Sequence, residues 1–142
     1  MLEQLPQKPP FLFLDRILEL STEHIIAERR FTGEEDFYKG HFPGDPVTPG
    51  VILTEAMAQA GLVALGIHLL NIEGQDKDKI RTLFTDCQVE FHKVVRPGEL
   101  VIISAEKIFW RRRKLQSQAE LRKENGELAA SGIISGFGVM IE

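Results

Sequence analysis

The chain is poor in the residues that build disulfide frameworks and metal sites. It has 142 residues, and Cys87 is its single cysteine, so no internal disulfide can form. Cysteine and histidine nowhere show the paired spacing of a zinc site, and we expect no metal. An unpaired cysteine suits a reducing compartment, which predicts a cytoplasmic protein.

Positive charge is also in the minority. Seventeen Lys and Arg against 21 Asp and Glu give a formal net charge of −4, which argues against a general nucleic-acid binder. The first residues lack a basic segment followed by an apolar run and a cleavage site, so we expect no signal peptide. The longest weakly polar run, residues 51–70, contains Glu55 and His68, whose presence disfavours a membrane span.

The common motifs for nucleotide binding and for serine hydrolases are missing, because the sequence contains no P-loop, no GxGxxG and no GxSxG. Hydrophobic residues nevertheless make up 43% of the chain, enough for one core. We therefore expect a single domain spanning residues 1–142.

Hydrophobic patterning predicts an α+β fold. One helix is expected from Pro49 to about Leu70, with Thr48 as its N-cap and Pro49 at its first position. It is apolar on nearly every face and must be wrapped on most sides. About six strands are expected, at residues 11–20, 24–31, 81–95, 100–110, 115–123 and 127–140.

The compact arrangement of these elements is an antiparallel sheet curled around the central helix. We expect the last four strands to pair consecutively, with a two-residue hairpin turn at Asn125-Gly126. Such a sheet leaves free edges, and free edges invite pairing with a second copy of the chain, which predicts a homodimer.

The stretch GHFPGDPVTPGVILTEAMAQAG, residues 40–61, contains the candidate site. Three prolines and three glycines stiffen residues 40–50, and a stiff loop can orient His41 as a base, although a lone histidine is more often structural or exposed. Glu55 is expected to be desolvated with a raised pKa, which suits a general acid or base, or else to be a buried structural carboxylate.

For two further residues of this stretch, the sequence allows either a role in the chemistry or a purely structural role. Gly50 offers the first free amide of the helix, which suits a carbonyl oxygen that gains negative charge, or it only permits a tight start to the helix. Gln59 lies one turn beyond Glu55 and either orients it by a hydrogen bond or extends a polar stripe.

Charge is concentrated in the run Arg111-Arg112-Arg113-Lys114, at an expected turn. The run is either a solvated turn or a docking patch for an acidic partner, which Lys93, Arg96 and Arg81 would extend.

The residues His41–Gly44, Pro49-Gly50 and Glu55–Gln59, together an HFPG…PG…EAMAQ pattern, closely resemble the signature of a known family. It is the FabZ type of 3-hydroxyacyl-[acyl-carrier-protein] dehydratase, in the FabA/FabZ hotdog family. The segments Pro10–Arg16 and Phe91–Glu99 also resemble that family, so the likeness covers nearly the whole chain.

The resemblance implies a hydro-lyase of fatty-acid, or related lipid or polyketide, biosynthesis. His41 and Glu55 would be a catalytic pair from opposite subunits, and the Gly50 amide would polarise the thioester carbonyl. Pro49 and Val51 would support the site together with Gln59. The lining of the acyl tunnel is assigned to Ile52, Ala56, Met57 and Ala60.

The implied partners are an acyl carrier protein and a second copy of the chain, with trimers of dimers as a further assembly. Carrier-protein docking is assigned to Lys93, Arg96, Arg111, Arg112, Arg113 and Lys114. No dissociable cofactor is expected, because the 4'-phosphopantetheine arm arrives on the carrier protein as part of the substrate. A hotdog acyl thioesterase and a non-catalytic carrier-binding subunit are the alternatives.

Overall fold

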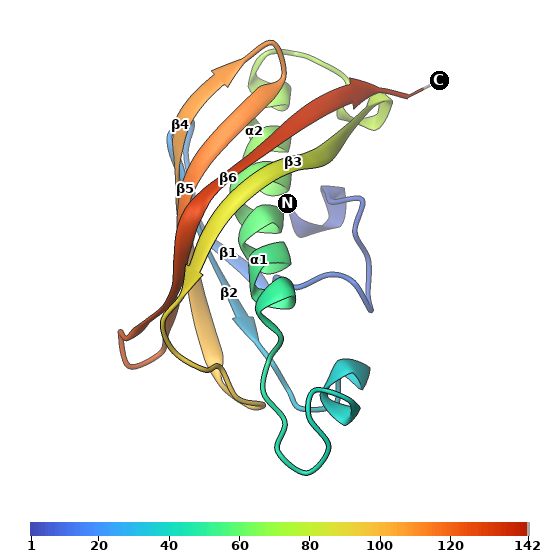
Figure 1. Cartoon of the computed structure of the whole chain (residues 1–142). Coiled ribbons are helices and arrows are strands. Elements are labelled where there is room, and N and C mark those ends of the chain that lie inside the picture. Colours follow the sequence, from blue (N-terminus) through green and yellow to red (C-terminus); the bar gives the residue numbers. More distant parts are fainter. Residues whose placement is uncertain (142) are drawn as a thin grey trace.

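The computed structural model describes residues 1–141 as one antiparallel sheet wrapped around one helix (Figure 1). The strands lie in the order β1-β2-β4-β5-β6-β3. This is the predicted hotdog fold, which is confirmed. The strands are β1 (Arg16–Leu20), β2 (His24–Arg30), β3 (Ile80–Phe91), β4 (Leu100–Arg111), β5 (Lys114–Lys123) and β6 (Leu128–Met140).

The central helix is continuous and contains three segments. These are α1 (Gly50–Ala58), the π-helical segment η3 (Gln59–Ala64) and α2 (Leu65–Ile72). Short 3₁₀ turns lie at η1 (Leu2–Gln4), η2 (Asp36–Lys39) and η4 (Lys77–Lys79). The helix has 23 residues. Its most apolar 18-residue stretch has a mean hydropathy of 1.6, and 72% of that stretch is buried against the rest of the chain. Burial inside the sheet therefore accounts for its apolar character.

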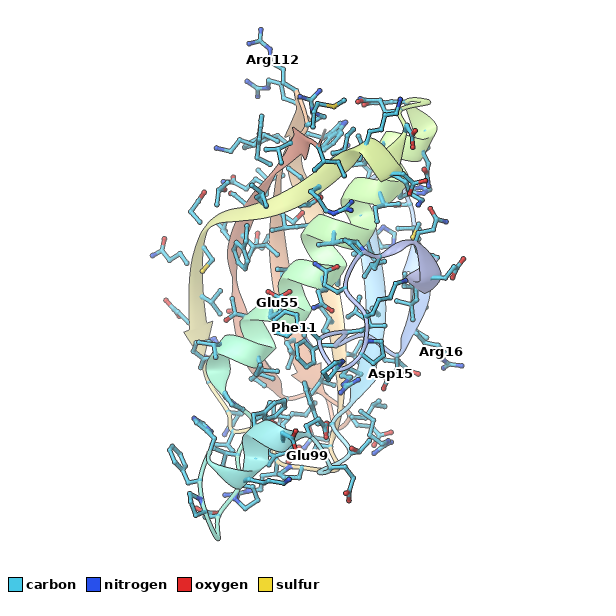
Figure 2. All side chains as sticks on the ribbon, turned by 90° about the vertical axis from the view of Figure 1, so that its right-hand side faces the viewer. Phe11, Asp15, Arg16, Glu55, Glu99 and Arg112 are labelled. Atoms are coloured by element: carbon cyan, nitrogen blue, oxygen red, sulfur yellow. The ribbon has the colours of Figure 1, made fainter. Side chains whose placement is uncertain are left out.

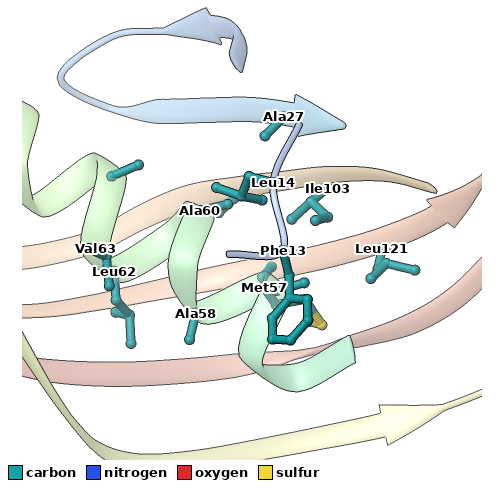
Figure 3. Close-up of a cluster of buried hydrophobic side chains, with 14 of the residues drawn as sticks. Phe13, Leu14, Ala27, Met57, Ala58, Ala60, Leu62, Val63, Ile103 and Leu121 are labelled. Carbon is teal, nitrogen blue, oxygen red and sulfur yellow. The ribbon is translucent and has the colours of Figure 1, made fainter. Parts of the chain in front are cut away.

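Small residues let the helix approach the sheet closely. Ala56 and Ala60 have no exposed surface, and a Cβ at Gly61 would lie 2.9 Å from the Cβ of Ala105 on β4. The hydroxyl of Ser117 on β5 donates to the Gly61 carbonyl (2.8 Å) inside the π-helical segment. Figure 3 shows the resulting core around Met57 and Ala60, packed against side chains from the N-terminal segment and the sheet.

The first strand is shorter than predicted, because β1 begins at Arg16 and the expectation of a strand over residues 11–15 is wrong. The side chain of Gln59 hydrogen-bonds the backbone there instead. Its Oε1 accepts from the Phe13 amide (2.8 Å), and its Nε2 donates to the Phe11 carbonyl (2.9 Å). Phe11 and Phe13 therefore cross the helix, and only Asp15 of residues 11–15 bonds the backbone of β2, through its amide to the Glu28 carbonyl (2.8 Å).

The start of the helix also differs from the prediction. Pro49 is the N-cap, with ψ 138°, and Gly50 is the first helical residue. Thr48 is not the cap, because its hydroxyl lies 2.6 Å from the Tyr38 hydroxyl instead.

The expectation that β3 pairs with β4 is wrong. β3 pairs with β6 along its length, from Ile80 opposite Met140 to Phe91 opposite Ala130. Residues 92–99 carry the chain across the end of the sheet, past β6 and β5, to β4. A connection that contains Pro97 and is longer than a tight turn permits this crossing. β3 is consequently a free edge of the sheet.

The prediction of a two-residue turn at Asn125-Gly126 is wrong, and the two-residue turn occurs at the β4–β5 hairpin. The two-residue turn joins β4 to β5 at Arg112 and Arg113, whose φ angles of 51° and 64° fit the left-handed turn that matches strand twist. The Asn125-Gly126 turn contains three residues, with Gly126 at φ 94° and a Lys123 amide that bonds the Glu127 carbonyl.

We expect Gly132→Ala to destabilise the fold by more than about 2 kcal/mol, because a Cβ there would overlap the Gln88 carbonyl and force β6 from β3. Urea unfolding followed by circular dichroism measures this. Gly66→Ala is the matched control, because its Cβ would meet Leu115 at an ordinary 3.8 Å and helix propensity favours alanine. Equal stability of the two variants would contradict the described β3–β6 pairing.

Candidate active site

A groove of about 260 Å³ lies between the helix and β3, and Glu55 lies on its wall. Figure 2 shows Glu55 on the helix next to Phe11 of the N-terminal segment. Most of the lining is apolar, so the groove suits an aliphatic chain next to a carboxyl group. The lining residues are Gln7, Phe11, Glu55, Ala58, Leu62, Val63, Thr82, Leu83 and Phe84.

Glu55 is partly buried, and this burial raises its pKa, while a hydrogen bond from Gln59 opposes the rise. The bond runs from Gln59 Nε2 to Glu55 Oε2 (2.9 Å). Gln59 has no exposed surface and also holds Phe11 and Phe13, so it is a rigid donor. A carboxyl group with a raised pKa and a fixed orientation can give or take a proton near neutral pH.

His41 lies in the loop between η2 and α1, residues 40–49, which we call the His41 loop. Its Nδ1 lies 3.0 Å from the Val47 carbonyl oxygen. Because a carbonyl can only accept, Nδ1 carries the hydrogen, and in the neutral imidazole Nε2 has the lone pair. The Val47 amide donates back to the His41 carbonyl (2.9 Å), and the Phe42 ring stacks on the imidazole at 4.2 Å. This geometry prepares Nε2 to act as a base.

Gly50 is the first residue of the helix. Its amide has no partner within the helix, because no helical carbonyl lies one turn before it. The partial positive charge of the helix start adds to it. The ring of Phe91, at the end of β3, lies over this glycine, since an added Cβ would be 3.0 Å from Phe91 Cζ. Only glycine leaves room for both the ring and the helix start. Beside it, Pro49 caps the helix and Val51 is exposed.

The structure brings some predicted site residues together and separates others. Gln59 contacts Glu55 as described, whereas His41 is not among the residues that line the groove. Within residues 1–141, no hydrogen bond joins His41 to Glu55. Within one chain, the His41 imidazole and the Glu55 carboxyl group therefore do not line the same groove.

The predicted tunnel lining does not match the groove. Ala56, Met57 and Ala60 have no exposed surface and pack into the core, and only Ile52 is partly exposed. The groove lies on the face of the helix that contains Glu55. Ala58 and Leu62, three and seven residues after Glu55, lie on the same face and also line the groove.

The basic residues assigned to docking lie in two groups, because Lys93 and Arg96 are apart from the Arg111–Lys114 hairpin, whereas Arg81 lies opposite Val139, next to the Gly138 that Arg113 bonds. Figure 2 shows Arg112 at one end of the molecule and Glu99, in the β3–β4 loop, at the other. Arg96 lies in that same loop and pairs with Asp45 of the His41 loop (3.3 Å). Lys93 pairs with Glu127 (3.7 Å). The Arg111–Lys114 hairpin is separated from them by the length of β4, about 36 Å for twelve residues.

Four residues near the site were not singled out from the sequence. Val47 orients His41 through its carbonyl, Phe91 covers Gly50, and Tyr38 bonds Thr48. Gln7 lines the groove, and its Oε1 is buried without a hydrogen-bond partner in the described part of the chain. Backbone carbonyls and long-range contacts have no local sequence signal, so only the fold could reveal them.

Comparison with known structures places the chain in a class of folds. It superposes on the dehydratase heterocomplex ApeI:P from Xenorhabdus doucetiae with a TM-score of 0.76, over 96% of this chain and 88% of that chain, at 16% identity. A hypothetical thioesterase with coenzyme A from Streptococcus pneumoniae gives a TM-score of 0.63 at 10% identity, over 88% of this chain and 85% of that one. At these identities the likeness shows the hotdog fold alone.

Sequence comparison then identifies the family. The model of the FabA-like domain matches residues 5–131. The 3-hydroxyacyl-[acyl-carrier-protein] dehydratase FabZ of Streptococcus uberis is 39% identical over 135 residues, which cover 94% of this chain and 91% of that protein. FabZ of Chlamydia trachomatis is 44% identical over 105 residues, which cover 72% of this chain and 66% of that protein. The chain belongs to the FabA-like family, and these relatives are FabZ dehydratases.

The raised pKa of Glu55 predicts a pH dependence of stability. The folded chain holds this proton to a higher pH than the unfolded chain does, whose glutamate pKa is about 4.3. From about that pH upward, ionisation of Glu55 favours unfolding. Urea unfolding across this range should show the free energy of unfolding of the wild type falling, relative to Glu55→Gln, as the pH rises.

Glu35→Gln is a control of opposite sign. Burial raises the Glu35 pKa, but hydrogen bonds from Thr32 and Gly33 outweigh it and leave the pKa lowered. Relative to this variant, the wild type should lose stability as the pH falls through the lowered pKa. A Glu55→Gln difference that is constant with pH would contradict the partly buried carboxyl.

Proposed function

We propose that this protein is a hydro-lyase that converts (3R)-3-hydroxyacyl-acyl-carrier-protein to the trans-2-enoyl thioester in fatty-acid, or a related lipid or polyketide, biosynthesis. The observation that carries the proposal is Glu55, a carboxyl group with a raised pKa on the wall of an apolar groove, in a chain whose relatives are FabZ dehydratases.

The groups described above supply each step of an elimination. His41 Nε2 removes the α-proton, and the Gly50 amide stabilises the negative charge that develops on the thioester oxygen. Protonated Glu55 gives its proton to the hydroxyl on the β-carbon. The C–O bond breaks, water leaves, and the electron pair of the α-carbon forms the new double bond.

The reaction requires His41 of one chain to meet Glu55 of another, and the free edge of β3 is the surface that supports such pairing. Leu83, Phe84 and Phe91 are 52%, 40% and 51% exposed on this strand, which is unusual for large apolar side chains on a free edge. Two copies joined along β3 would extend the sheet and cover these side chains. A trimer of such dimers stays a prediction.

The carrier protein would approach at the end of the molecule that holds the His41 loop, because Lys93 and Arg96 lie there. The acidic carrier is attracted by these cations. The pantetheine arm belongs to the substrate, so we propose no dissociable cofactor. The buried acceptor of Gln7 would take a hydrogen bond from the substrate hydroxyl or a pantetheine amide.

The substrate assay separates this function from its alternatives. The purified protein is given 3-hydroxyacyl carrier-protein thioesters of several chain lengths. Rising absorbance of the conjugated enoyl thioester indicates dehydration, whereas release of a free thiol indicates a thioesterase. Binding without either product indicates a non-catalytic subunit.

We expect His41→Ala and Glu55→Gln each to lower the dehydration rate at least ~10²-fold, the scale of losing a general base or acid. Circular dichroism should show both variants folded, because neither side chain belongs to the apolar core. Near-normal turnover of either variant would remove that residue from the mechanism.

The same pair tests the shared site. If the two residues act from opposite subunits, mixing inactive His41→Ala with inactive Glu55→Gln protein should restore activity in mixed dimers, each of which has one intact pair. The mixture is first unfolded and refolded together, so that chains exchange. Activity no higher than the sum of the separate variants would show that both groups act within one chain.

Pairing along β3 has its own test. We expect the wild type to sediment at twice the mass of one chain, and Leu83→Glu to shift the population toward monomer, because it places a charge where apolar contact is needed. Glu124→Lys, an exposed change in the β5–β6 turn, is the control. A wild-type monomer at micromolar concentration would exclude the proposed dimer.

A further inference from the structure

Two buried hydroxyl groups meet at the base of the His41 loop. The Tyr38 hydroxyl, on η2, lies 2.6 Å from the Thr48 hydroxyl, which immediately precedes Pro49. Tyr38 is 5% exposed and Thr48 is 6% exposed. Burying two hydroxyls has a desolvation cost that only a hydrogen bond between them offsets. This bond therefore has a defined geometry and holds together the two ends of the loop.

Other hydrogen bonds of this loop involve His41 itself. The His41 amide donates to the Phe37 carbonyl (3.1 Å), next to Tyr38 in the chain. The ring and carbonyl of His41 both bond Val47, next to Thr48. The orientation of the imidazole thus depends on Phe37 and Val47. The bond between the Tyr38 and Thr48 hydroxyls holds together the two chain segments that contain them.

Both hydroxyl partners are anchored outside the loop. The Thr48 amide donates to the carbonyl of Val95 (2.8 Å), which is fully buried. The Tyr38 amide donates to Glu35, and its ring packs on Phe37 at 4.6 Å between centroids. The pair therefore connects the loop to the core at both ends.

Thr48 stands where a helix cap would ordinarily be expected, yet its hydroxyl does not bond the helix. Side-chain capping is a common stabilising use of threonine before a helix. Here the Ile52 and Leu53 amides donate to the Pro49 carbonyl, and within residues 1–141 no hydrogen bond uses the Gly50 amide. The orientation of one hydroxyl thus affects both the loop and the helix start.

We propose that Tyr38 and Thr48 form a positioning pair for catalysis, which holds His41 at a set place relative to the Gly50 amide. This inference rests on the proposed dehydration. Neither hydroxyl touches the substrate, and both act through the His41 loop. Removing either one should loosen the imidazole without removing a chemical group from the reaction.

The kinetic test uses Tyr38→Phe and Thr48→Val, which delete one hydroxyl each. We expect kcat to fall about 10-fold in either variant, the scale of one lost hydrogen bond, while KM changes less than about 2-fold. The double variant should be no worse than either single one, because the two hydroxyls make one bond. Thr48→Ser keeps the hydroxyl and should retain wild-type kcat, and Thr22→Val, an exposed turn position, is the matched control.

A double variant that combines Tyr38→Phe with His41→Ala distinguishes a positioning role from a structural one. If Tyr38 acts through the imidazole, Tyr38→Phe should not lower the residual rate of His41→Ala any further. A pair that only supports folding would lower that rate too. Further loss in this background, or an unchanged kcat in Tyr38→Phe, would overturn the proposal.

A measurement made without substrate tests the positioning of His41 independently of the proposed function. The His41 Nδ1 proton, identified in NMR spectra by its absence from His41→Ala, should exchange with solvent at least about 5-fold faster in Tyr38→Phe, because its bond to Val47 opens more often. If the wild type fails to dehydrate but this exchange still accelerates, the function is wrong and the positioning stands. Unchanged exchange overturns the positioning whatever the activity.

Discussion

The side chain of Gln59 makes the interaction on which the rest of this structure depends. It is fully buried on the central helix, and its amide bonds three different groups: the Phe13 amide, the Phe11 carbonyl and the Glu55 carboxyl. A buried amide left unpaired is costly, so these contacts specify how the N-terminal segment crosses the helix. The same crossing places Phe11 in the groove wall and leaves residues 11–15 outside the sheet.

This one amide therefore couples fold and chemistry. The backbone that it holds closes one side of the groove, and the carboxyl that it orients lies inside. The pKa of Glu55 is a balance between burial, which raises it, and the Gln59 hydrogen bond, which opposes the rise. A stronger donor at position 59 would favour the ionised carboxylate, so a neutral amide suits the acid role proposed for Glu55.

Much of the architecture could be predicted because it follows from periodicity. The helix from Pro49, the six strands and the sheet around the helix are all encoded in apolar patterns and turn residues. Pairing could not be predicted in the same way. β3 does not pair with β4, the next strand in the sequence, but with β6, and long-range packing determines this pairing. The left-handed pair Arg112-Arg113 also lacks the residues that usually announce such a turn.

The candidate site shows the same division. His41, Gly50, Glu55 and Gln59 could be found from their sequence context, and the Glu55–Gln59 bond follows directly from helix spacing. The groove lining could not be found in this way. The helix is apolar on nearly every face, so its sequence does not indicate which face lines the groove. Thr48 was a reasonable cap by residue type, but a tyrosine ten residues earlier takes its hydroxyl. Local rules fail where a distant side chain competes for the same group.

The ring that lies over Gly50 has a consequence for how the molecule works in dilute solution. Phe91 belongs to the free edge strand, yet its ring packs against Gly50, the first residue of the helix. A chain that paired with that edge would also constrain the Phe91 ring beside Gly50. If two chains pair along β3 as proposed, assembly would change the surroundings of the Gly50 amide, and specific activity per chain would depend on protein concentration as well as on substrate.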